Sequence, residues 1–383
     1  MAPSLRWDIV CRVVDNFGDA GVCFRLARQL AAEHGIAVTL WIDDVRSLAH
    51  FVPSLAADGR DQVAEGVRVR ALDDASPPAS PLPDVVIEGF GCGLPHAYVA
   101  AMAAAPKAPV WIVLEYLSAE PWIESSHALP SPHPQLPLTR WFWFPGFTRS
   151  TGGLLREADL FARRDAFRGG DAHREGLARA VGVRPTPGAF WVSLFCYANA
   201  ALPVLLDAWA DGDETVTCIV PEGVAGSELD RWSGGQVPHP GAPLTRGRLT
   251  LAVAPFVDQD AFDRRLWACD LDFVRGEDSF VRAQWAAAPF VWHAYPQEAD
   301  AHLAKMDAFL NRLEAHMEPH ARAAQRAFWY AWNAADPVAS AQAWPAYREA
   351  LPAIAATARA WASDLATQPD LTGGLVRFCE SKL

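Results

Sequence analysis

The chain has 383 residues, 51% of them hydrophobic, and a formal net charge of −12 at pH 7. Its length predicts two domains, and the negative charge argues against direct binding to duplex nucleic acid, which requires a basic face. The first ten residues lack the basic start and apolar stretch of a secretory signal, and no segment is apolar over a membrane-spanning length, so we expect a cytoplasmic protein without a membrane partner.

The first part of the chain alternates short apolar runs with segments of helical period. The spacing predicts strands at 8–14, 36–42, 67–72, 84–90 and 110–117, and helices at 22–34, 44–55 and 94–105. Strands that alternate with helices indicate a mostly parallel sheet covered on both faces. Residues 119–150 are rich in proline and aromatic residues and have no clear period, so a long ordered loop is predicted there.

After a helical stretch between Leu155 and Val181, the same alternation begins again. It predicts strands at 189–197, 215–221, 248–256, 271–276 and 289–296, and helices near 200–210, 259–269 and 278–287. From Asp300 to Ala366 the sequence is almost entirely helical. The predicted fold class is α/β, with an N-terminal domain at 1–180, a C-terminal domain at 181–360, and a helical tail at 361–383 that packs back on the N-terminal domain.

Residues 15–22, DNFGDAGV, follow the first predicted strand and place two acids on a loop punctuated by glycines. A helix N-cap would explain one of these acids, but not both Asp15 and Asp19. The motif lacks the glycine fingerprint of dinucleotide-binding proteins, and carboxylates beside a helix N-terminus would repel a diphosphate. The pattern therefore favours a substrate that is cationic or that loses a proton.

The second half of the chain carries a comparable motif, VRGEDSFVRAQW at 274–285, where a predicted strand ends and a helix begins. The N–H groups of the first helical turn, the hydroxyl of Ser279 and the guanidinium of Arg275 would together suit a diphosphate. The alternative is an ordinary N-cap by Asp278, with Arg275 solvated or paired with an acid.

Aromatic residues follow two further strands of this half. Aromatic side chains at strand ends commonly belong to a core, but a base or a sugar ring also stacks on them. The candidates for such stacking, with one hydrogen-bonding neighbour, are Phe195, Tyr197, Phe256, Phe262 and Gln259.

Asp270 and Asp272 form a DxD pattern, which in metal-dependent sugar transferases binds a divalent cation with the nucleotide diphosphate. One such pattern in a chain with 45 acidic residues is weak evidence for a metal site. We predict neither a metal nor any other cofactor.

Several long segments, in the same order along nearly the whole chain, resemble one known family. They are DNFGDAGVCFRLARQL, EGFGCGLP, LEYLSAEPW, LPSPHPQLPLTRWFWFPGF, SLFCY, APFVDQDAFD and FVRGEDSFVRAQWAAAPFVWHAYPQ. The family comprises the protein-arginine rhamnosyltransferases that modify bacterial translation elongation factor P. The resemblance implies a GT-B glycosyltransferase fold of two Rossmann-like domains, and inverting, metal-independent transfer of rhamnose from dTDP-β-L-rhamnose to a guanidine nitrogen of one arginine in elongation factor P.

The resemblance also implies roles for individual residues. Asp19 is the implied general base, with Asp15 beside it and Glu277 as a third important carboxylate. In the implied donor site, Phe256 packs against thymine. Arg275, Asp278 and Ser279 hold the diphosphate. The donor-site residues are Phe195, Tyr197, Phe256, Gln259, Phe262, Arg275, Asp278 and Ser279. The implied acceptor-binding residues are Asn16, Phe17, Glu115 and Tyr116.

This assignment explains why two acids would share one loop. A guanidinium stays protonated at any physiological pH, so carboxylates must bind it, turn one nitrogen toward the anomeric carbon and accept a proton as the bond forms. Two alternatives stay open: a GT-B transferase with another sugar nucleotide or acceptor, and a non-catalytic module that binds a translation factor.

Overall fold

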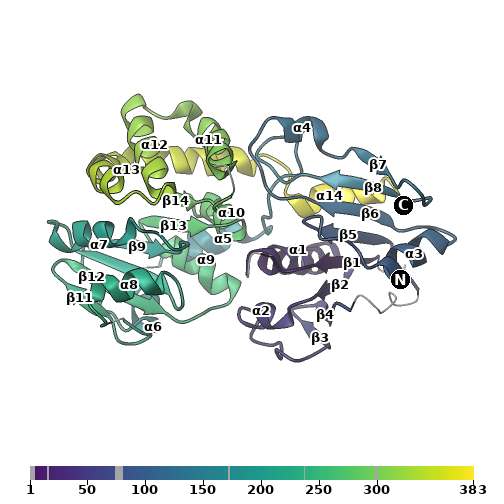
Figure 1. The fold of residues 1–383 in the computed structure, drawn as a ribbon, viewed down its shortest axis with the longest axis horizontal. Coiled ribbons are helices and arrows are strands. Elements are labelled where there is room, and N and C mark those ends of the chain that lie inside the picture. Colours follow the sequence, from purple (N-terminus) through teal and green to yellow (C-terminus); the bar gives the residue numbers. More distant parts are fainter. Residues whose placement is uncertain (1–4, 15–16, 74–80, 171–172, 237, 298–300) are drawn as a thin grey trace. The chain divides into compact units, whose positions relative to one another are not determined.

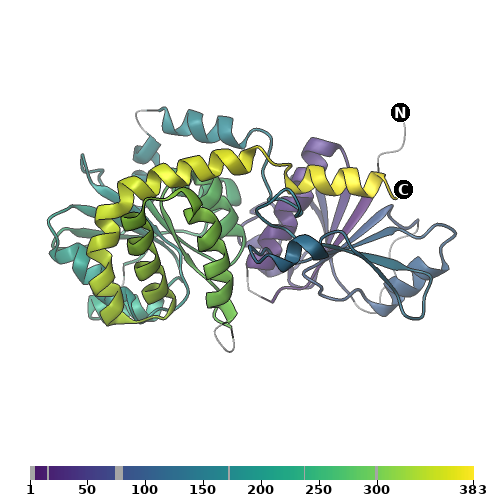
Figure 2. The ribbon, with the colours of Figure 1, turned by 90° about the horizontal axis from the view of Figure 1, so that it is seen from above.

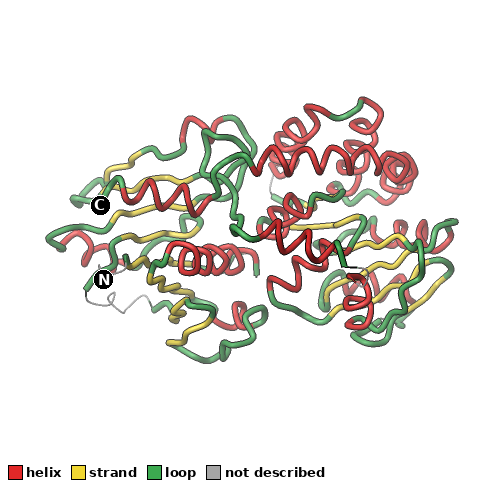
Figure 3. The backbone as a smooth tube through the Cα atoms, turned by 180° about the vertical axis from the view of Figure 1, so that it is seen from behind, coloured by secondary structure: helices red, strands yellow, loops and turns green. Residues whose placement is uncertain are grey.

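A computed structural model describes residues 5–14, 17–73, 81–170, 173–236, 238–297 and 301–383. Within it the chain forms two units: unit 1 comprises Met1–Ala158 and Leu365–Leu383, and unit 2 comprises Asp159–Asp364. Each unit has a twisted sheet with helices packed on its faces (Figures 1 and 3). None of the helices in the described part of the chain combines the length and apolarity needed to cross a membrane.

Unit 1 is built on an eight-stranded sheet in the order β3-β4-β2-β1-β5-β6-β8-β7. All neighbours pair in parallel except the two edge strands, β3 and β7, which pair antiparallel. Ile9 at the centre pairs with Leu40 on one side and Ile87 on the other, and all three are buried. The strands are β1 (Arg6–Cys11), β2 (Ala37–Ile42), β3 (Asp61–Ala64), β4 (Val67–Ala71), β5 (Val85–Gly89), β6 (Val110–Leu114), β7 (Pro130–Pro132) and β8 (Thr139–Trp143).

The helices of unit 1 cover both faces of this sheet. They are α1 (Gly18–His34), α2 (Val45–Ala49), α3 (His96–Ala104), α4 (Trp122–Ser126) and α14 (Leu371–Glu380). The last of these comes from the C-terminal segment, and it packs on α1 (Figure 2). Its Leu371 and Leu375 are buried in the core of the unit. The N–H of Leu371 donates to the carbonyl of Leu154 at 2.9 Å, which fixes where the returning chain joins the unit.

Unit 2 has a six-stranded sheet in the order β11-β12-β10-β9-β13-β14, parallel except for β11 at its edge. Its strands are β9 (Phe190–Leu194), β10 (Val216–Pro221), β11 (Leu244–Arg246), β12 (Leu249–Ala254), β13 (Leu271–Arg275) and β14 (Phe290–His293). Its helices are α5 (Leu160–Arg168), α6 (His173–Ala180), α7 (Leu202–Asp211), α8 (Gly226–Ser233), α9 (Gln259–Ala268), α10 (Asp278–Ala286), α11 (Ala301–Leu313), α12 (Pro319–Asn333) and α13 (Pro337–Ala366).

The structure confirms the predicted central strands and the helical C-terminal part, and corrects three other features. The segment 119–150 is not one long loop, because it contains α4, β7 and β8, and β8 extends the sheet beside β6. Helix α1 begins at Gly18 instead of residue 22, so Asp19 lies in its first turn. Helix α8 and the short edge strands β3 and β11 were not predicted.

The first unit boundary also lies earlier than predicted, between Ala158 and Asp159 instead of at residue 180. Helices α5 and α6 pack against α9, and three arginines anchor them to carbonyl groups at the carboxyl ends of α9 and α10. The donors and their acceptors are Arg164 to Trp285, Arg168 to Trp267 and Arg174 to Ala268. A guanidinium at a helix carboxyl end is favourable because it satisfies free carbonyls and opposes the helix dipole. The second boundary falls between Asp364 and Leu365, four residues after the predicted one.

Candidate functional site

In unit 1 the strand order reverses between β1 and β5, which lie side by side at the centre of the sheet. Ligands of open α/β sheets bind outside the carboxyl ends of the strands at such a reversal. The segments that leave this edge are the one between β1 and α1, the one between β5 and α3, and the one that follows β6. The fold therefore directs attention to Asp19 in the first turn of α1, to Phe90 after β5 and to Glu115 after β6.

Asp19 is buried, with 3% of its surface exposed, in the first turn of α1. Its Oδ2 accepts a hydrogen bond from the N–H of Val14 at 2.8 Å, and its Oδ1 lies 3.4 Å from the hydroxyl of Tyr116. The positive end of the helix dipole favours a carboxylate at this position. Two other residues predicted for this loop, Asp15 and Asn16, lie outside the described residues.

Tyr116 and Phe90 stack with their ring centroids 4.5 Å apart, which places two aromatic faces next to Asp19. Tyr116 is 42% exposed, so one side of the pair is open to a partner. Phe90 holds a left-handed backbone conformation, φ 55°, which is unusual for a non-glycine residue. Phe90 was not predicted as a site residue. Phe17, which was, packs its ring against His50 and the core of unit 1.

Glu115 is half-buried beside Tyr116, and burial raises the pKa of its carboxyl, with a further contribution from the nearby carboxylate of Glu88. Glu88 is buried at the end of β5, where it accepts hydrogen bonds from the N–H of Gly93 at 2.9 Å and from the indole of Trp111 at 3.0 Å. It thereby fixes the loop that presents Phe90. No sequence pattern indicated this role, because Glu88 lies inside an apolar strand.

In unit 2 the strand order reverses between β9 and β13, and Arg275 ends β13 at this point. Its guanidinium lies over the rings of Phe195 and Tyr197, at 4.4 and 4.7 Å from their centroids, and donates to the carbonyl of Cys196 at 3.2 Å. Among the described residues, no carboxylate forms an ion pair with Arg275. A half-buried cation held by rings and a carbonyl is suited to an anionic ligand.

Helix α10 begins next to this cation. Its N-cap residue is Glu277, whose side chain makes no capping hydrogen bond, and Asp278 lies in the first turn instead of capping it. The hydroxyl of Ser279 accepts from the N–H of Arg275 and donates to its carbonyl, so it holds the turn that carries Arg275. The positive end of α10 and Arg275 thus lie at one edge of the sheet, which is an arrangement that binds phosphates.

Aromatic residues lie at the carboxyl ends of the strands on this side of the sheet. Phe195 meets Phe262 edge-to-face at 5.6 Å, and Tyr197 meets both His293 and Tyr295 edge-to-face. Phe256 is 39% exposed, as a ring that stacks on a ligand must be. Gln259, at the start of α9, is buried. His293 and Tyr295, which end β14 and follow it, were not predicted.

The two acids of the DxD pattern lie in different surroundings. The carboxylate of Asp270 accepts from Arg174 at 2.6 Å and from the N–H of Trp191 at 2.8 Å. Asp272 is fully buried within β13, and burial raises the pKa of its carboxyl well above the usual range. Over the described part of the chain, no group of three or more His, Cys, Asp and Glu side chains is arranged to hold a metal ion.

Comparisons with known proteins relate the whole chain to one family. A sequence profile of the Elongation-Factor P (EF-P) rhamnosyltransferase EarP family matches residues 7–380. The chain is 48% identical to the protein-arginine rhamnosyltransferase of Pseudomonas putida, over 98% of this chain and 99% of that protein. It is 44% identical to the protein-arginine rhamnosyltransferase of Pseudomonas aeruginosa, over 97% of this chain and 98% of that protein.

Solved structures give the same relationship. The structure that describes EarP-mediated arginine glycosylation of translation elongation factor EF-P is 37% identical to this chain, with a TM-score of 0.71 and 99% of each chain covered. Acinetobacter baumannii MurG (14% identity, TM-score 0.50, 99% and 100% covered) and Phytolacca americana UGT2 (11%, 0.52, 99% and 99%) share the fold alone. Both are GT-B glycosyltransferases, so the predicted α/β fold of GT-B type is confirmed.

Proposed function

The chain belongs to the elongation factor P rhamnosyltransferase family and is a glycosyltransferase, and from this premise we propose its donor, acceptor and stereochemistry. It transfers L-rhamnose from dTDP-β-L-rhamnose to a guanidine nitrogen of one arginine in elongation factor P, with inversion at the anomeric carbon. The observation that carries this proposal is that the two units carry opposite charges at the carboxyl ends of their central strands. In unit 1 this position holds the buried carboxylate of Asp19. In unit 2 it holds Arg275, which has no carboxylate partner among the described residues.

The proposed acceptor chemistry follows from the residues at the carboxyl ends of the central strands of unit 1. A guanidinium is always charged and has its donors in one plane, so it binds carboxylates well and loses a proton only as its nitrogen forms a bond. Asp19 orients the guanidinium and accepts that proton, and Asp15 remains a predicted second carboxylate. The carboxylate of Glu115 and the face of Tyr116 complete the surface that binds the cation, because a guanidinium also stacks on aromatic rings. Asn16 and Phe17 remain predicted acceptor contacts.

The proposed donor chemistry follows from the residues at the carboxyl ends of the strands of unit 2. Arg275 and the N-terminus of α10, with Asp278 and Ser279, hold the diphosphate, and the exposed ring of Phe256 stacks on thymine. Phe195, Tyr197, Gln259 and Phe262 surround the nucleotide and the sugar. Glu277, at the N-cap of α10, serves as the third carboxylate, next to the sugar.

The reaction balances without a further reactant. A guanidine nitrogen attacks the anomeric carbon from the face opposite the phosphate, so a C–N bond forms, the C–O bond to dTDP breaks and the configuration inverts. The proton of the attacking nitrogen passes to Asp19, and dTDP leaves with the electron pair of the broken bond. Arg275 and the helix N-terminus stabilise the charge that develops on dTDP.

Incubation with dTDP-rhamnose and elongation factor P tests the proposal directly. We expect the mass of the factor to rise by one deoxyhexose residue, located on one arginine by peptide sequencing. Modification by a UDP-sugar or GDP-sugar, or of another protein, would support the alternative transferase. Tight binding of the factor without any mass change would support the non-catalytic module.

A further inference from the structure

A buried ion pair in unit 2 connects the two helices whose first turns form the donor site. We propose that this pair, Asp263 of α9 with Arg282 of α10, is a positioning pair for the sugar nucleotide: it sets how the nucleotide-binding turn of α9 and the diphosphate-binding turn of α10 are placed relative to each other. The inference rests on the proposed function, because it assumes that these two turns bind the donor.

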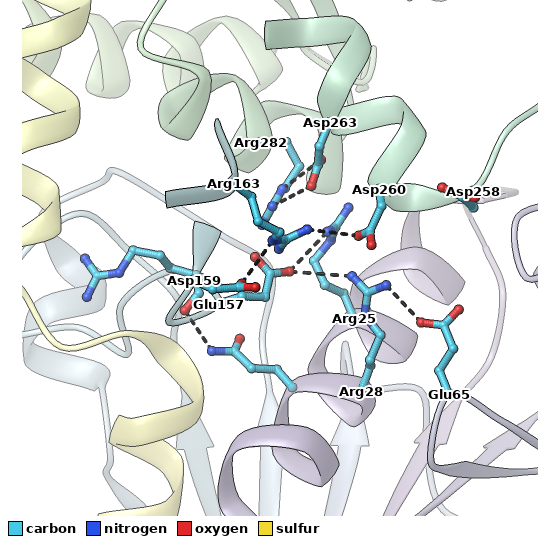
Figure 4. Close-up of polar contacts among 12 residues, drawn as sticks. Arg25, Arg28, Glu65, Glu157, Asp159, Arg163, Asp258, Asp260, Asp263 and Arg282 are labelled. Carbon is cyan, nitrogen blue, oxygen red and sulfur yellow. Dashed lines mark hydrogen bonds and ion pairs between the residues drawn. The ribbon is translucent and has the colours of Figure 1, made fainter. Parts of the chain in front are cut away.

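The geometry of the pair is that of a two-point contact. Nε of Arg282 lies 3.0 Å from Oδ1 of Asp263, and its Nη2 lies 2.6 Å from Oδ2 (Figure 4). Both side chains are 1% exposed. A bidentate contact between a planar guanidinium and a carboxylate fixes orientation as well as distance. A relative shift of α9 and α10 would therefore break at least one of the two bonds.

The pair lies one helical turn behind the donor residues. Asp263 follows Gln259 by four residues, so both lie on one face of α9. Arg282 follows Ser279 by three residues on α10. The hydroxyl of Ser279 in turn bonds the backbone of Arg275 on both sides, so the position of α10 is transmitted to the diphosphate-binding arginine.

Stability alone is a poor explanation for this pair. Removing two charges from water costs several kcal/mol each, and well-packed apolar side chains of similar volume are often equally stabilising at such a site. An apolar pair would, however, hold the helices by packing alone, without two bonds of fixed direction. Active-site groups need placement to within about 0.5 Å. The two-point contact between Asp263 and Arg282 provides this precision of placement.

The experiment separates positioning from stability with variants of both partners. Arg282→Met or Asp263→Leu alone removes one partner of the two-point contact, leaves the other charge buried and should lower the melting temperature. The double variant, Asp263→Leu with Arg282→Met, should recover most of the melting temperature, yet its dissociation constant for dTDP should remain raised by about tenfold or more. In turnover, the KM for the sugar nucleotide should rise while the KM for elongation factor P stays unchanged.

Arg282→Lys provides a second measurement, because it keeps the charge and loses the planar fork. We expect it to fold and to bind dTDP several-fold more weakly than the original protein. A matched control is a second buried ion pair, Arg25 with Glu157 at 3.2 Å (Figure 4), whose two residues both belong to unit 1. Arg25→Met with Glu157→Leu should leave the affinity for dTDP unchanged.

Two results would overturn the inference. If the double variant recovers affinity together with stability, or if Arg282→Lys binds dTDP as the original protein does, the pair only stabilises the fold. The failure of the proposed function gives a different pattern: the unaltered protein would not bind dTDP at all, and the inference would be overturned with it.

Discussion

The hydroxyl of Tyr116 lies 3.4 Å from Oδ1 of Asp19, although 97 residues separate the two in the sequence. Tyr116 follows β6 and Asp19 lies in the first turn of α1, so their meeting depends on the strand order that places β1, β5 and β6 side by side. The stacked ring of Phe90 comes from the segment after β5, between the other two. Three neighbouring strand ends thus bring a buried carboxylate and two stacked rings together, and our proposal assigns this group to the arginine of the acceptor.

Asp19→Asn should abolish most of the turnover without unfolding the protein. The amide retains an oxygen that can accept the hydrogen bond from Val14, but it carries no charge and takes up no proton. Loss of a general base typically lowers kcat by about 10²- to 10⁴-fold. The rate of mass increase on elongation factor P measures turnover, while calorimetry with dTDP should show unchanged affinity.

The matched control for Asp19 is Asp61→Asn in the same unit. Asp61 forms surface ion pairs with Arg68 and Arg70 at 2.7 and 2.9 Å and lies on edge strand β3, which β4 and β2 separate from β1. Its replacement should leave kcat within about twofold, because exposed pairs contribute little to stability. Full activity of Asp19→Asn would remove Asp19 from the chemical step.

Tyr116 should contribute through both its hydroxyl and its ring. Tyr116→Phe removes the hydroxyl and with it the long hydrogen bond to Asp19, a bond worth about 1 kcal/mol or less, so kcat should fall by roughly fivefold. Tyr116→Ala also removes the stacking on Phe90, worth about 0.5–1.5 kcal/mol, and should raise the KM for elongation factor P as well. Steady-state kinetics of both variants distinguishes the two contributions, and identical kinetics would exclude a role for the ring.

The central strands could be predicted from the sequence for a simple physical reason. A parallel strand buried on both faces consists of continuous apolar residues, as in VWIVL of β6 and VTCIVP of β10. Edge strands such as β7, with the sequence PSP, lack this signal. Strand β8, TRWFW, lies in a proline-rich segment and was missed because its pairing with β6 is a tertiary contact.

In the candidate site, too, residues with a local sequence signal could be predicted, and residues placed by tertiary contacts could not. Charges directly after apolar runs marked Asp19 and Arg275, since side chains at strand ends are the ones a parallel sheet presents to a ligand. Phe90 was not predicted, because its place depends on a left-handed backbone and on Tyr116 from another segment. The pairing of Asp263 with Arg282 could not be predicted either. Periodicity shows which face of a helix is buried, but not which residue of another helix that face contacts.

Arg275→Lys should bind the donor poorly although it keeps the positive charge. An ammonium has no planar face to place over the rings of Phe195 and Tyr197 while it bonds the carbonyl of Cys196. Hydrogen bonds to charged groups contribute about 1.5–3 kcal/mol, so the dissociation constant for dTDP should rise by roughly 10- to 100-fold. Titration calorimetry gives this constant without requiring turnover.

Arg348→Lys is the control for this prediction. Arg348 also lies over a ring, that of Phe190 at 4.3 Å, but at the beginning of β9, and it pairs with Glu214. Its substitution should leave the affinity for dTDP unchanged. If Arg275→Lys and Arg348→Lys both bind dTDP normally, Arg275 does not hold the diphosphate.

Leu375→Ala should destabilise unit 1 and leave donor binding intact. Leu375 is completely buried where α14 joins the core of unit 1, and truncation of a buried leucine to alanine typically costs about 2–5 kcal/mol. The proposed donor residues all belong to unit 2, so the dissociation constant for dTDP should not change. Urea unfolding followed by fluorescence measures the loss, with exposed Glu380→Ala as control. A loss below about 0.5 kcal/mol would mean that α14 is not part of the core.

The buried His293 should make the stability of unit 2 fall as the pH is lowered. It is 2% exposed, and burial, with smaller contributions from Arg275 and His302, lowers its pKa from 6.5 to about 4. Between these two values the unfolded chain takes up a proton at this position and the folded chain does not. The free energy of unfolding therefore declines as the pH falls through this window, by up to about 3 kcal/mol.

His293→Gln removes this titration and keeps a polar side chain beside Tyr197. Its free energy of unfolding should depend less steeply on pH than that of the original protein, with the difference confined to about pH 4 to 6.5. Urea unfolding at several pH values measures both slopes, and His96→Gln, an exposed histidine on α3 of unit 1, should keep the original slope. Equal slopes in the original protein and in His293→Gln would mean that His293 is protonated as easily in the folded chain as in the unfolded one, which would require water to reach its ring.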